Sequence, residues 1–591
     1  MTVRIMSWRT AGFWLAAGLA AVLLQHWLIP LNAPNSFGLF SNGGDLMTYR
    51  FGGLRVLHRE LLYATEIPDA GWFTYTPFAA MLFAPLGFVT LGAAKVVWFL
   101  VNLGALFAII WRCWRVLGFS ANAPLTIACV GMNLVAWDIQ PIHGTLWQGQ
   151  VNLVLAALII WDLTRPEDAR WRGWSVGVAS GVKLTAVIFV PYLLITRQWR
   201  AVAAAAVTAI GTVVLGWIVL PSDSSDYWLG AVRTTGHIGS LDHPANSSIG
   251  GALANVYTPQ PMPTWLWVLL AGGAALLGMA AAWRAHRTGR ELLAITVVGM
   301  VGCVVSPLAW THHWVWTVPL MVLLVNQIMA TQGGARWRWA AATTVIAVLV
   351  SMWWYWGLYV RAMRLNPDFE SYITGWGAVI AHMSRAERVF DTALYPLLFL
   401  TVAIWVLATG PSDQVPTCRY RAGMRRWAAT CAVALFTVSG CSAWDRAEST
   451  PTSYTPQQTG ASPVRYDSDP LEQRFPKLPK PVTGEWVQGF FSDEPLPGPN
   501  TTYWMDAIIE MPPQQLAAYV APFRASMVLA SRPRLWKTLD TGVPAAAQFE
   551  RSDELDWMLS TNTDKGGWQV KAFAPKDGSV LILSARGKDA G

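Results

Sequence analysis

The sequence AVAAAAVTAIGTVVLGWIVLPS occupies residues 201–222 and contains no Asp, Glu, Lys or Arg. About 20 consecutive apolar residues are enough for a helix to cross the roughly 30 Å hydrocarbon core of a bilayer. A first such stretch, residues 11–30, follows Arg4 and Arg9. Further charge-free stretches lie at residues 116–137, 139–161, 259–283, 292–311, 314–335, 339–360 and 392–412. The pattern predicts an all-α polytopic membrane protein.

The composition and charge indicate that lipid is the main solvent. Of 591 residues, 53% are hydrophobic and 13% are charged, and 35 are Trp. The formal net charge is +8, but much of the basic excess lies in short clusters between apolar stretches, which is typical of membrane topology and not of nucleic-acid binding. The six cysteines show no Cys-x-x-Cys spacing, so neither a disulfide framework nor a zinc site is predicted.

The basic clusters set the orientation of the chain, because Lys and Arg are enriched in cytoplasmic loops. The clusters lie at Arg112/Arg115, 165–172, Arg197/Arg200, 284–290, Arg336/Arg338 and 419–426. The segments left on the outer side are 31–73, 138–148, 221–258, 306–313 and 361–388. We expect the chemistry of the protein in these outer segments.

Two regions do not fit a simple alternation of sides. From Phe73 to Ile110 the apolar sequence suffices for two crossings but the charges allow one, so we expect an interfacial helix near 76–90 and a span near 93–111. Residues 173–195 begin and end at cytoplasmic clusters. This predicts two half-helices or a re-entrant hairpin, broken near Lys183.

The composition changes after residue 412. Residues 413–441 contain four arginines, an apolar run and the box Val438-Ser439-Gly440-Cys441. This is the layout of a bacterial lipoprotein signal, with Cys441 as the lipidation site. The alternative is a last transmembrane helix. In either interpretation the remainder of the chain lies outside.

We therefore divide the chain into four segments. Residues 1–412 are expected to form the membrane domain and 413–441 the signal-like segment. Residues 442–483 are assigned to a linker because they are rich in Pro, Ser, Thr and Gln. Alternating apolar residues within 484–591 predict a small α+β domain, whose role the residues do not indicate.

The first outer segment carries the most chemical information. It reads Gly43-Gly44-Asp45-Leu46-Met47-Thr48-Tyr49, then Gly52-Gly53, Leu62-Tyr63 and Phe73-Thr74-Tyr75-Thr76-Pro77-Phe78. A carboxylate just beyond a first span, among glycines and aromatics, is partly removed from water, which raises its basicity. Asp45 is therefore a candidate general base. The alternative is that Asp45 caps the helix that follows.

These motifs resemble the opening of the polyprenol-phosphate-mannose-dependent α-mannosyltransferases, glycosyltransferase family 87, within the GT-C architecture. Three later stretches resemble motifs of the same family in the same order: GQVNL at 149–153, GVKLT at 181–185 and SPLAWTHH at 306–313. The resemblance covers roughly residues 10–410 and does not reach the tail.

The resemblance implies that Asp45 is the catalytic base. It implies a polyprenyl-phosphate mannose donor and a lipid-anchored glycan acceptor of the phosphatidylinositol mannoside or lipomannan type, with membrane lipids around both. Where the family usually has Tyr-Pro-Pro, this chain has Tyr75-Thr76-Pro77, which bears on the shape of the loop and not on the placement of Asp45. No cofactor and no nucleotide-binding motif is expected, and the need for a divalent cation stays open.

Lys183 stands inside an apolar stretch. An ammonium group there costs several kcal/mol unless it is paired or hydrated, so an intramembrane lysine is a functional-site hypothesis. A lipid phosphate is a natural partner for it. The alternative is a lysine that reaches the cytoplasmic interface from a short helix.

His312 and His313 lie on the expected outer side, after a Ser-Pro that bends or ends the preceding helix. Adjacent histidines on a helix cannot both point one way, so we expect one of them to donate to a phosphate oxygen of the donor. The alternative is interfacial packing. A metal site needs more ligands than Asp45 supplies, so none is predicted.

Four further residues are candidate substrate contacts: Tyr49, Tyr75, Gln150 and Asn152. The two amides could equally hydrogen-bond neighbouring helices. The Trp-rich segment 353–356 is assigned to the interfacial aromatic belt rather than to a sugar platform. The outer segment 221–258 is expected to be a solvated loop, although it contains polar residues that could line an acceptor cleft: Arg233, His237, Asp242 and His243.

The charge pattern predicts a protein of the inner (plasma) membrane with its active site and C-terminal domain outside the cytoplasm, and the resemblance implies that it is an inverting glycosyltransferase. Asp45 would take the proton of the acceptor hydroxyl, and Lys183 with a histidine would stabilise the departing phosphate. The first alternative is a transferase of the same architecture with a polyprenyl-phosphate arabinose or glucose donor. The second is a transporter or flippase of a lipid-linked sugar, whose expected internal repeats the sequence lacks.

Overall fold

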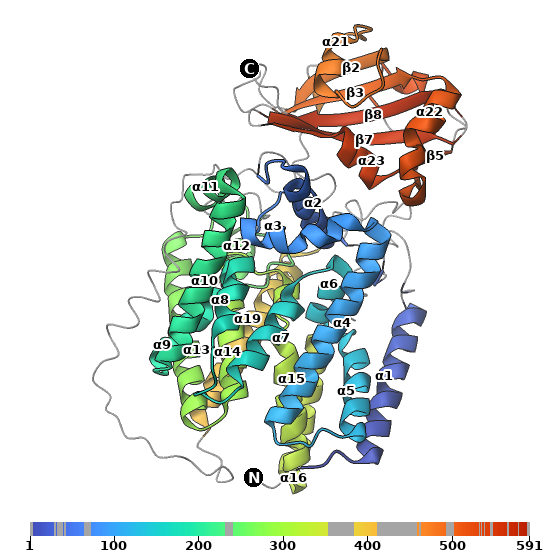
Figure 1. Cartoon of the computed structure of the whole chain (residues 1–591). Helices are drawn as coiled ribbons and strands as arrows, with labels where there is room; N and C mark the ends of the chain where they lie inside the picture. Colours follow the sequence, from blue (N-terminus) through green and yellow to red (C-terminus); the bar gives the residue numbers. More distant parts are fainter. Residues whose placement is uncertain are drawn as a thin grey trace. The chain divides into compact units, whose positions relative to one another are not determined.

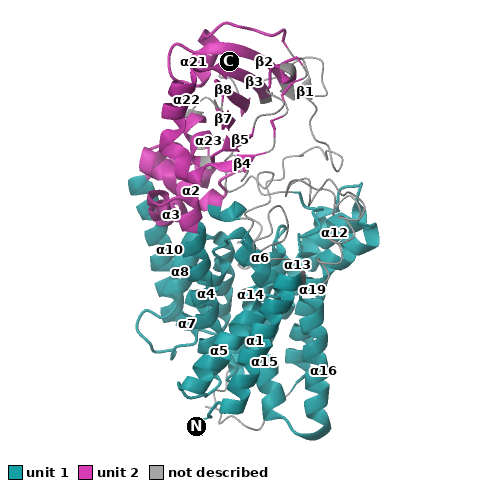
Figure 2. Cartoon of the chain, turned by 90° about the vertical axis from the view of Figure 1, so that its right-hand side faces the viewer, with its two compact units in different colours: residues 1–46, 95–219, 232–449 teal, residues 47–94, 220–231, 450–591 magenta. Residues whose placement is uncertain are grey.

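The computed structural model describes residues 4–28, 31, 39–40, 43–63, 72–230, 240–352, 383–409, 458–459, 462–491 and 502–587, the last range with short gaps. The chain divides into two units, coloured separately in Figure 2. Unit 1 comprises residues 1–46, 95–219 and 232–449, and unit 2 comprises residues 47–94, 220–231 and 450–591. Unit 1 is helical, whereas unit 2 combines short helices with a β-sheet.

The helices of unit 1 form a bundle (Figure 1). In chain order they are α1 (Trp8–Leu28), α4 (Leu91–Val116), α5 (Ala123–Ala136), α6 (Gln140–Gln148), α7 (Asn152–Leu163), α8 (Trp174–Val182), η2 (Leu184–Ile188), α9 (Phe189–Ile195), α10 (Trp199–Val219), α12 (Ile249–Tyr257), α13 (Thr264–Arg287), α14 (Glu291–Val305), η4 (Thr311–His313), α15 (Thr317–Ala330), α16 (Gly333–Leu349) and α19 (Arg385–Ala408). The first residues of α4 belong to unit 2.

Four of the described helices, α4, α10, α13 and α19, are long and apolar enough to cross a membrane, and the bent pair α6 and α7 brings the number to as many as five. A short helical stretch over Pro77–Phe88 precedes α4, at the place where the charges predicted a helix before a span. The chain is therefore a multi-pass membrane protein.

The charge-free stretch 139–161 forms two helices, and the first of them, α6, lies in the segment 138–148 that is expected on the outer side. The axes of α6 and α7 differ by 119°. The turn between them is made by Gly149, which has a left-handed backbone (φ 71°) and ends α6. Glycine adopts this conformation without the steric cost that a Cβ brings, so it commonly ends helices in this way.

The chain between residues 173 and 195 is broken at Lys183, as predicted. Lys183 ends α8 in an extended conformation (φ −144°, ψ 112°), and η2 and α9 follow. A Cβ on Gly177 would lie 2.0 Å from Oγ1 of Thr208, and one on Gly181 would lie 2.3 Å from Oγ1 of Thr212. These glycines let α8 pack directly against α10, which fixes the end of α8 where Lys183 lies.

Unit 2 contains an antiparallel sheet with the strand order β1-β2-β3-β8-β7-β5-β4, and β6 pairs with β7. The strands are β1 (Gln458–Thr459), β2 (Thr483–Phe491), β3 (Thr502–Glu510), β4 (Val528–Ala530), β5 (Phe549–Arg551), β6 (Thr561–Thr563), β7 (Gly566–Pro575) and β8 (Val580–Gly587). The helices of this unit are α2 (Gly44–His58), α3 (Pro77–Phe83), η1 (Ala84–Phe88), α11 (Pro221–Leu229), α21 (Asp469–Arg474), α22 (Pro513–Val520), η5 (Ala521–Ser526), η6 (Asp540–Gly542) and α23 (Asp553–Leu559), although α2 begins in unit 1.

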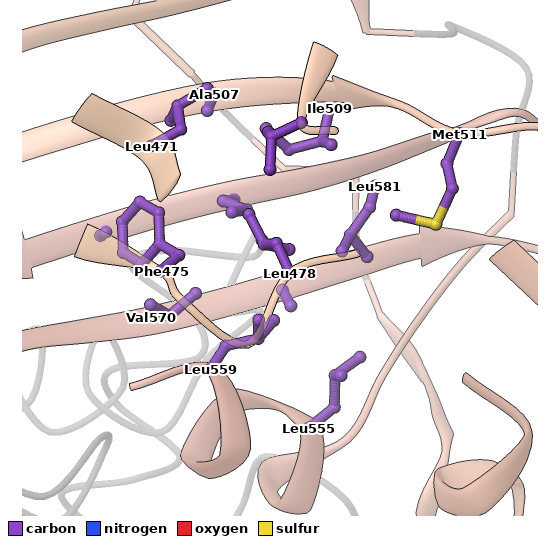
Figure 3. Packing of buried hydrophobic residues seen from close by; sticks show 14 of the residues in the cluster. Leu471, Phe475, Leu478, Ala507, Ile509, Met511, Leu555, Leu559, Val570 and Leu581 are labelled. Atoms are coloured by element: carbon purple, nitrogen blue, oxygen red, sulfur yellow. The ribbon is translucent and has the colours of Figure 1, made fainter. Parts of the chain in front are cut away.

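The sheet has an apolar core on each face, because side chains alternate along a strand. On β8, Leu581 and Leu583 belong to the larger cluster, whereas Ile582 belongs to the smaller one. Figure 3 shows the larger cluster, in which Leu471 and Phe475 pack with the strands. These two residues fall in the segment assigned to a linker, so the packed domain begins earlier than residue 484. Leu478 and Val482 of the same segment are also buried in this cluster.

Within unit 2, α2 contacts the sheet domain through an ion pair. The guanidinium of Arg50 is 5% exposed and donates to Oε1 of Glu554 at 3.1 Å and to the carbonyl of Val89 at 2.8 Å. The other carboxylate oxygen of Glu554 accepts from Oγ of Ser526 at 2.9 Å. A buried guanidinium needs such partners because its desolvation is costly.

Candidate active site

Asp45 is the second residue of α2 and is partly buried. Its carboxylate is hydrogen-bonded to the side chain of Gln150. Removal from water raises the pKa of Asp45, while the bond to Gln150 and the positive charge of Lys183 oppose this rise. A carboxyl group with a raised pKa is a stronger base than an exposed one, which suits proton abstraction.

Two glycines bring the amide of Gln150 to Asp45. Gly43 precedes α2 with a φ of 137°, and Gly149 precedes Gln150 with a φ of 71°. A Cβ on Gly149 would lie 2.7 Å from Cβ of Leu46, so the turn between α6 and α7 lies directly against the start of α2. The same turn thus ends α6 and sets the partner of the carboxylate.

Lys183 lies at the centre of a polar cluster. Its Nζ donates to Oδ1 of Asn152 at 3.0 Å and lies 3.1 Å from Nε2 of His313. Asn152 is the first residue of α7, just after the turn that carries Gln150. The break after α8, the start of α7 and the η4 turn therefore meet at one ammonium group.

The two histidines are held by their backbone carbonyls. The carbonyl of His312 accepts from Nδ2 of Asn152 at 2.9 Å and from Oγ1 of Thr145 at 3.1 Å. The carbonyl of His313 accepts from Sγ of Cys303 at 3.3 Å. Their ring centroids are 4.9 Å apart, with an interplanar angle of 74°.

The histidines differ in their ring contacts. Nε2 of His313 faces Lys183, whereas Nε2 of His312 is buried and has no hydrogen-bond partner among the residues that the structure describes. Burial and the charge of Lys183 hold the pKa of both histidines well below the usual value, so both rings are neutral at pH 7. A buried polar atom without a partner costs free energy, and a ligand oxygen would satisfy it.

A cavity of about 60 Å³ adjoins this cluster. Its polar wall includes Asn152, Lys183 and His313. Its apolar wall includes Ile159, Phe189 and Trp316. Within the described part of the chain, no three His, Cys, Asp or Glu side chains are grouped as metal ligands.

The structure thus brings Asp45, Gln150, Asn152, Lys183 and His313 into one network, with His312 beside it. These residues were predicted from separate parts of the sequence. Their catalytic roles stay predictions.

Tyr49 and Tyr75 belong to unit 2, whereas the residues of this network belong to unit 1. Their hydroxyls are 3.0 Å apart and their rings meet edge to face, with centroids 4.9 Å apart. Tyr49 also stacks on Phe83 at 4.3 Å. Both tyrosines are buried, and their contact with substrate stays a prediction. Cys441 and the segment 353–356 lie outside the described residues.

Some residues of the site had no recognisable signal in the sequence. Thr145 and Cys303 hold the histidine carbonyls, yet each reads as an ordinary residue of an apolar stretch. The prediction of a solvated loop over 221–258 is wrong for its described part at 246–248, where the side chains are fully buried. Polar side chains can be buried there because the backbone of the histidine loop satisfies them. Arg233 and His237 lie outside the described residues.

Comparison with known proteins places the chain among membrane transferases. Residues 73–307 match the profile of glycosyltransferase family 87. A polyprenol-phosphate-mannose-dependent alpha-(1-2)-phosphatidylinositol pentamannoside mannosyltransferase of Mycobacterium tuberculosis (strain CDC 1551 / Oshkosh) is 33% identical, over 53% of this chain and 73% of the relative. A polyprenol-phosphate-mannose-dependent alpha-(1-2)-phosphatidylinositol mannoside mannosyltransferase of Mycolicibacterium smegmatis (strain ATCC 700084 / mc(2)155) is 32% identical, over 52% and 74%.

A more distant relative carries another sugar in its name. An alpha-(1->3)-arabinofuranosyltransferase of Corynebacterium glutamicum (strain ATCC 13032) is 24% identical, over 62% of this chain and 94% of the relative. No solved structure matches the chain. The chain is 33% and 32% identical to these two mannosyltransferases and covers 73% and 74% of their lengths. The protein therefore belongs to glycosyltransferase family 87 and is a membrane glycosyltransferase.

Proposed function

We propose that this protein transfers mannose from polyprenyl-phosphate mannose to a lipid-anchored glycan of the phosphatidylinositol mannoside or lipomannan type. The names of the relatives that are 32% and 33% identical support the donor and the class of acceptor. The helices of unit 1 then form a GT-C membrane domain within residues 1–412. Its active site faces the outer side of the plasma membrane, and so does the C-terminal domain.

One observation carries the mechanism: a carboxylate and an ammonium–histidine cluster share one polar network. Asp45 accepts from Gln150 and interacts with the charge of Lys183, which in turn contacts His313. A transferase that works by a single displacement needs a base for the acceptor and a cationic or hydrogen-bonding group for the leaving phosphate. The network supplies both kinds of group.

In the proposed reaction, Asp45 takes the proton of the acceptor hydroxyl as its oxygen bonds to the anomeric carbon of mannose. The bond from that carbon to the phosphate oxygen breaks at the same time, and polyprenyl phosphate leaves with the electron pair. Attack from the face opposite the phosphate inverts the anomeric centre. The negative charge that develops on the phosphate is stabilised by Lys183 and by a histidine N–H.

The two histidines fit different parts of this step. Protonated Lys183 donates to Nε2 of His313, so His313 keeps its own proton on Nδ1 and orients the ammonium. Nε2 of His312 has no partner within the described residues, so a proton on it is available for a phosphate oxygen. The cavity beside Lys183 continues to apolar side chains such as Phe189 and Trp316, which suits a phosphate joined to an isoprenoid chain.

For the tail, we propose that 413–441 is a lipoprotein-like signal or a last transmembrane helix, and that 442–483 contains a linker to the sheet domain. Labelling with palmitate, repeated with Cys441→Ala, tests the first of these. Equal labelling of both chains would exclude lipidation at this position.

The rival donor is polyprenyl-phosphate arabinose, and its support is the 24% identity to an arabinofuranosyltransferase. The test is transfer by membranes that contain the wild-type chain, supplied in parallel with radiolabelled polyprenyl-phosphate mannose and polyprenyl-phosphate arabinose. Incorporation into lipid from the mannose donor alone is expected. Incorporation from the arabinose donor alone would overturn the choice of sugar, and incorporation from neither donor would favour the transporter alternative.

A further inference from the structure

The segment 245–248 is built into the wall behind the histidines. Asn246, Ser247 and Ser248 are 0%, 1% and 0% exposed. Their side chains therefore cannot make up their hydrogen bonds with water, and each needs a protein partner. Each of the three has a partner in the loop between α14 and α15, which carries His312 and His313.

Both polar atoms of the Asn246 side-chain amide make hydrogen bonds. Its Nδ2 donates to the carbonyl of Leu241 at 2.9 Å and to that of Pro307 at 3.0 Å. Its Oδ1 accepts from the backbone N–H of Ala309 at 3.0 Å and from Oγ of Ser248 at 2.9 Å. One amide therefore ties its own segment to the start of the histidine loop with all four of its hydrogen-bonding positions filled.

The backbone of the segment 245–248 also forms hydrogen bonds with the loop, before and after the two histidines. The N–H of Ser247 donates to the carbonyl of Ala309 at 2.8 Å, and the N–H of Thr311 donates to that of Ala245 at 3.0 Å. Nε1 of Trp314 donates to the carbonyl of Ser247 at 2.9 Å. Residues 311 and 314 thus both bind the segment, and the histidine pair lies between them.

The histidines are consequently held from two directions. Thr145 and Asn152 bind the carbonyl of His312 from α6 and α7, and the segment 245–248 fixes the loop from the other side. Small errors in the position of a catalytic group are costly, since a displacement of about 1 Å can lower a rate on the order of 100-fold. Nε2 of His312, which has no hydrogen-bond partner among the described residues, can be aimed only if this loop is fixed.

We propose that Asn246 is a positioning residue for the phosphate-binding histidines, and that the segment 245–248 fixes the loop that carries them. The proposal rests on the function proposed above. Asn246 is fully buried and acts through the loop, at Pro307 and Ala309.

The test is Asn246→Asp in the full-length chain, assayed with radiolabelled polyprenyl-phosphate mannose. Asp has the same shape but lacks the two N–H donors, so the carbonyls of Leu241 and Pro307 would face a carboxylate oxygen. Because the histidines act on charge that develops in the transition state, kcat is expected to fall about 10- to 100-fold with little change in the KM for the donor.

Asn255→Asp is the matched control. Asn255 is a buried amide of the next helix, 2% exposed, and its Nδ2 donates at 3.0 Å to the carbonyl of Gly251 in its own helix. This variant therefore carries the cost of a buried carboxylate, and within the described residues Asn255 makes no hydrogen bond to the histidine loop. It should lower the melting temperature comparably and keep the wild-type kcat.

A milder variant, Ser247→Ala, removes the hydroxyl that lies 3.3 Å from Oγ1 of Thr311 and keeps the proposal testable if Asn246→Asp does not fold. A selective loss of kcat, about threefold or more, supports the proposal. Wild-type kcat in both Asn246→Asp and Ser247→Ala overturns it, and so does an equal loss in Asn255→Asp. Absence of transfer by the wild-type chain instead refutes the proposed function.

Discussion

Nζ of Lys183 lies 3.1 Å from Nε2 of His313, although 130 residues separate them in the chain. The contact joins the break after α8 to the turn before α15. Of the two adjacent histidines, His313 makes this contact, and His313 also lines the cavity beside Lys183. The ring of His313 contacts the ammonium group of Lys183. Nε2 of His312 has no hydrogen-bond partner among the described residues.

We expect the effects of Lys183 and His313 on catalysis to be coupled. Lys183→Met and His313→Gln each remove one end of the same contact, so each should lower kcat/KM, and the double variant should be little worse than the poorer single one. His312→Gln should instead multiply the loss caused by His313→Gln. Steady-state kinetics of the three single and two double variants measure both couplings. Additive effects of Lys183→Met and His313→Gln would contradict the shared role.

The pH dependence of transfer should report the surroundings of Asp45. A base acts in its deprotonated form, and removal from water raises the pKa of Asp45 above that of a free Asp, about 4. Activity should therefore fall as the pH decreases through this raised pKa. In Gln150→Leu the carboxylate loses a hydrogen bond that lowers its pKa, so the acid limb of kcat/KM should move to higher pH.

The control for this shift is Gln140→Leu. Gln140 is also a buried amide of the same region, but it accepts from the hydroxyl of Tyr395 at 2.7 Å. The acid limb should keep its wild-type position in this variant. An acid limb that stays in place in Gln150→Leu, or moves to lower pH, would show that the carboxylate of Asp45 does not govern the profile.

Gly149→Ala should damage catalysis more than stability. A Cβ at this position is strained by the left-handed backbone, about 1–2 kcal/mol, and meets Cβ of Leu46 at 2.7 Å. The start of α2 must shift, which moves Asp45 relative to Gln150, and we expect kcat/KM to fall at least about 10-fold. Gly273→Ala in α13 is the control, since nothing in the described part of the chain lies within 4 Å of the added Cβ. Transfer assays with thermal melts would decide, and wild-type activity of Gly149→Ala would contradict the argument.

Much of the site could be predicted because its residues are conspicuous in an apolar sequence. Lys183 is a charge inside a span, and His312 and His313 follow a Ser-Pro that ends a helix, so each stands out without knowledge of the fold. The resemblance of their motifs to one family then put Asp45 in the same site. These predictions concern which residues matter, and local sequence suffices for that.

The contacts that position these residues could not be predicted in the same way. Residues 139–161 are one charge-free stretch, and the bend at Gly149 is not visible in it, because a left-handed glycine looks like any other glycine in a sequence. Asn246 reads as a polar loop residue, and only the approach of the histidine loop buries it. Leu471 and Phe475 are sparse apolar residues in a Pro-rich segment, and their four-residue spacing acquires meaning only against the sheet.

The sheet domain should become more stable on mild acidification. Asp506 is 1% exposed, and burial raises its pKa to about 6, although it accepts from the N–H of Trp536 at 2.7 Å and from Oγ of Ser584 at 2.8 Å. The folded carboxyl binds a proton more tightly than the unfolded one, so protonation favours folding. The contribution is lost as the pH rises from about 4 to about 6 and is regained on acidification, with about 1 kcal/mol gained between pH 7 and pH 5.

Hydrogen exchange of the β3 and β8 amides in the full chain, corrected for intrinsic rates, measures this change. Asp506→Asn cannot titrate and should remove it. A loss of protection between pH 7 and pH 5 in the wild-type chain, or an identical gain in Asp506→Asn, would contradict the assignment to Asp506.

The most direct test of the central claim is transfer of radiolabelled mannose from polyprenyl-phosphate mannose into lipid by membranes that carry wild-type or Asp45→Asn chains at equal abundance. Asn keeps the shape of the side chain and cannot accept the proton of the acceptor. General base catalysis typically contributes about 10²- to 10⁴-fold, so we predict a loss of kcat of at least about 100-fold in the variant. Equal rates of transfer by the two chains would contradict the assignment of Asp45 as the base.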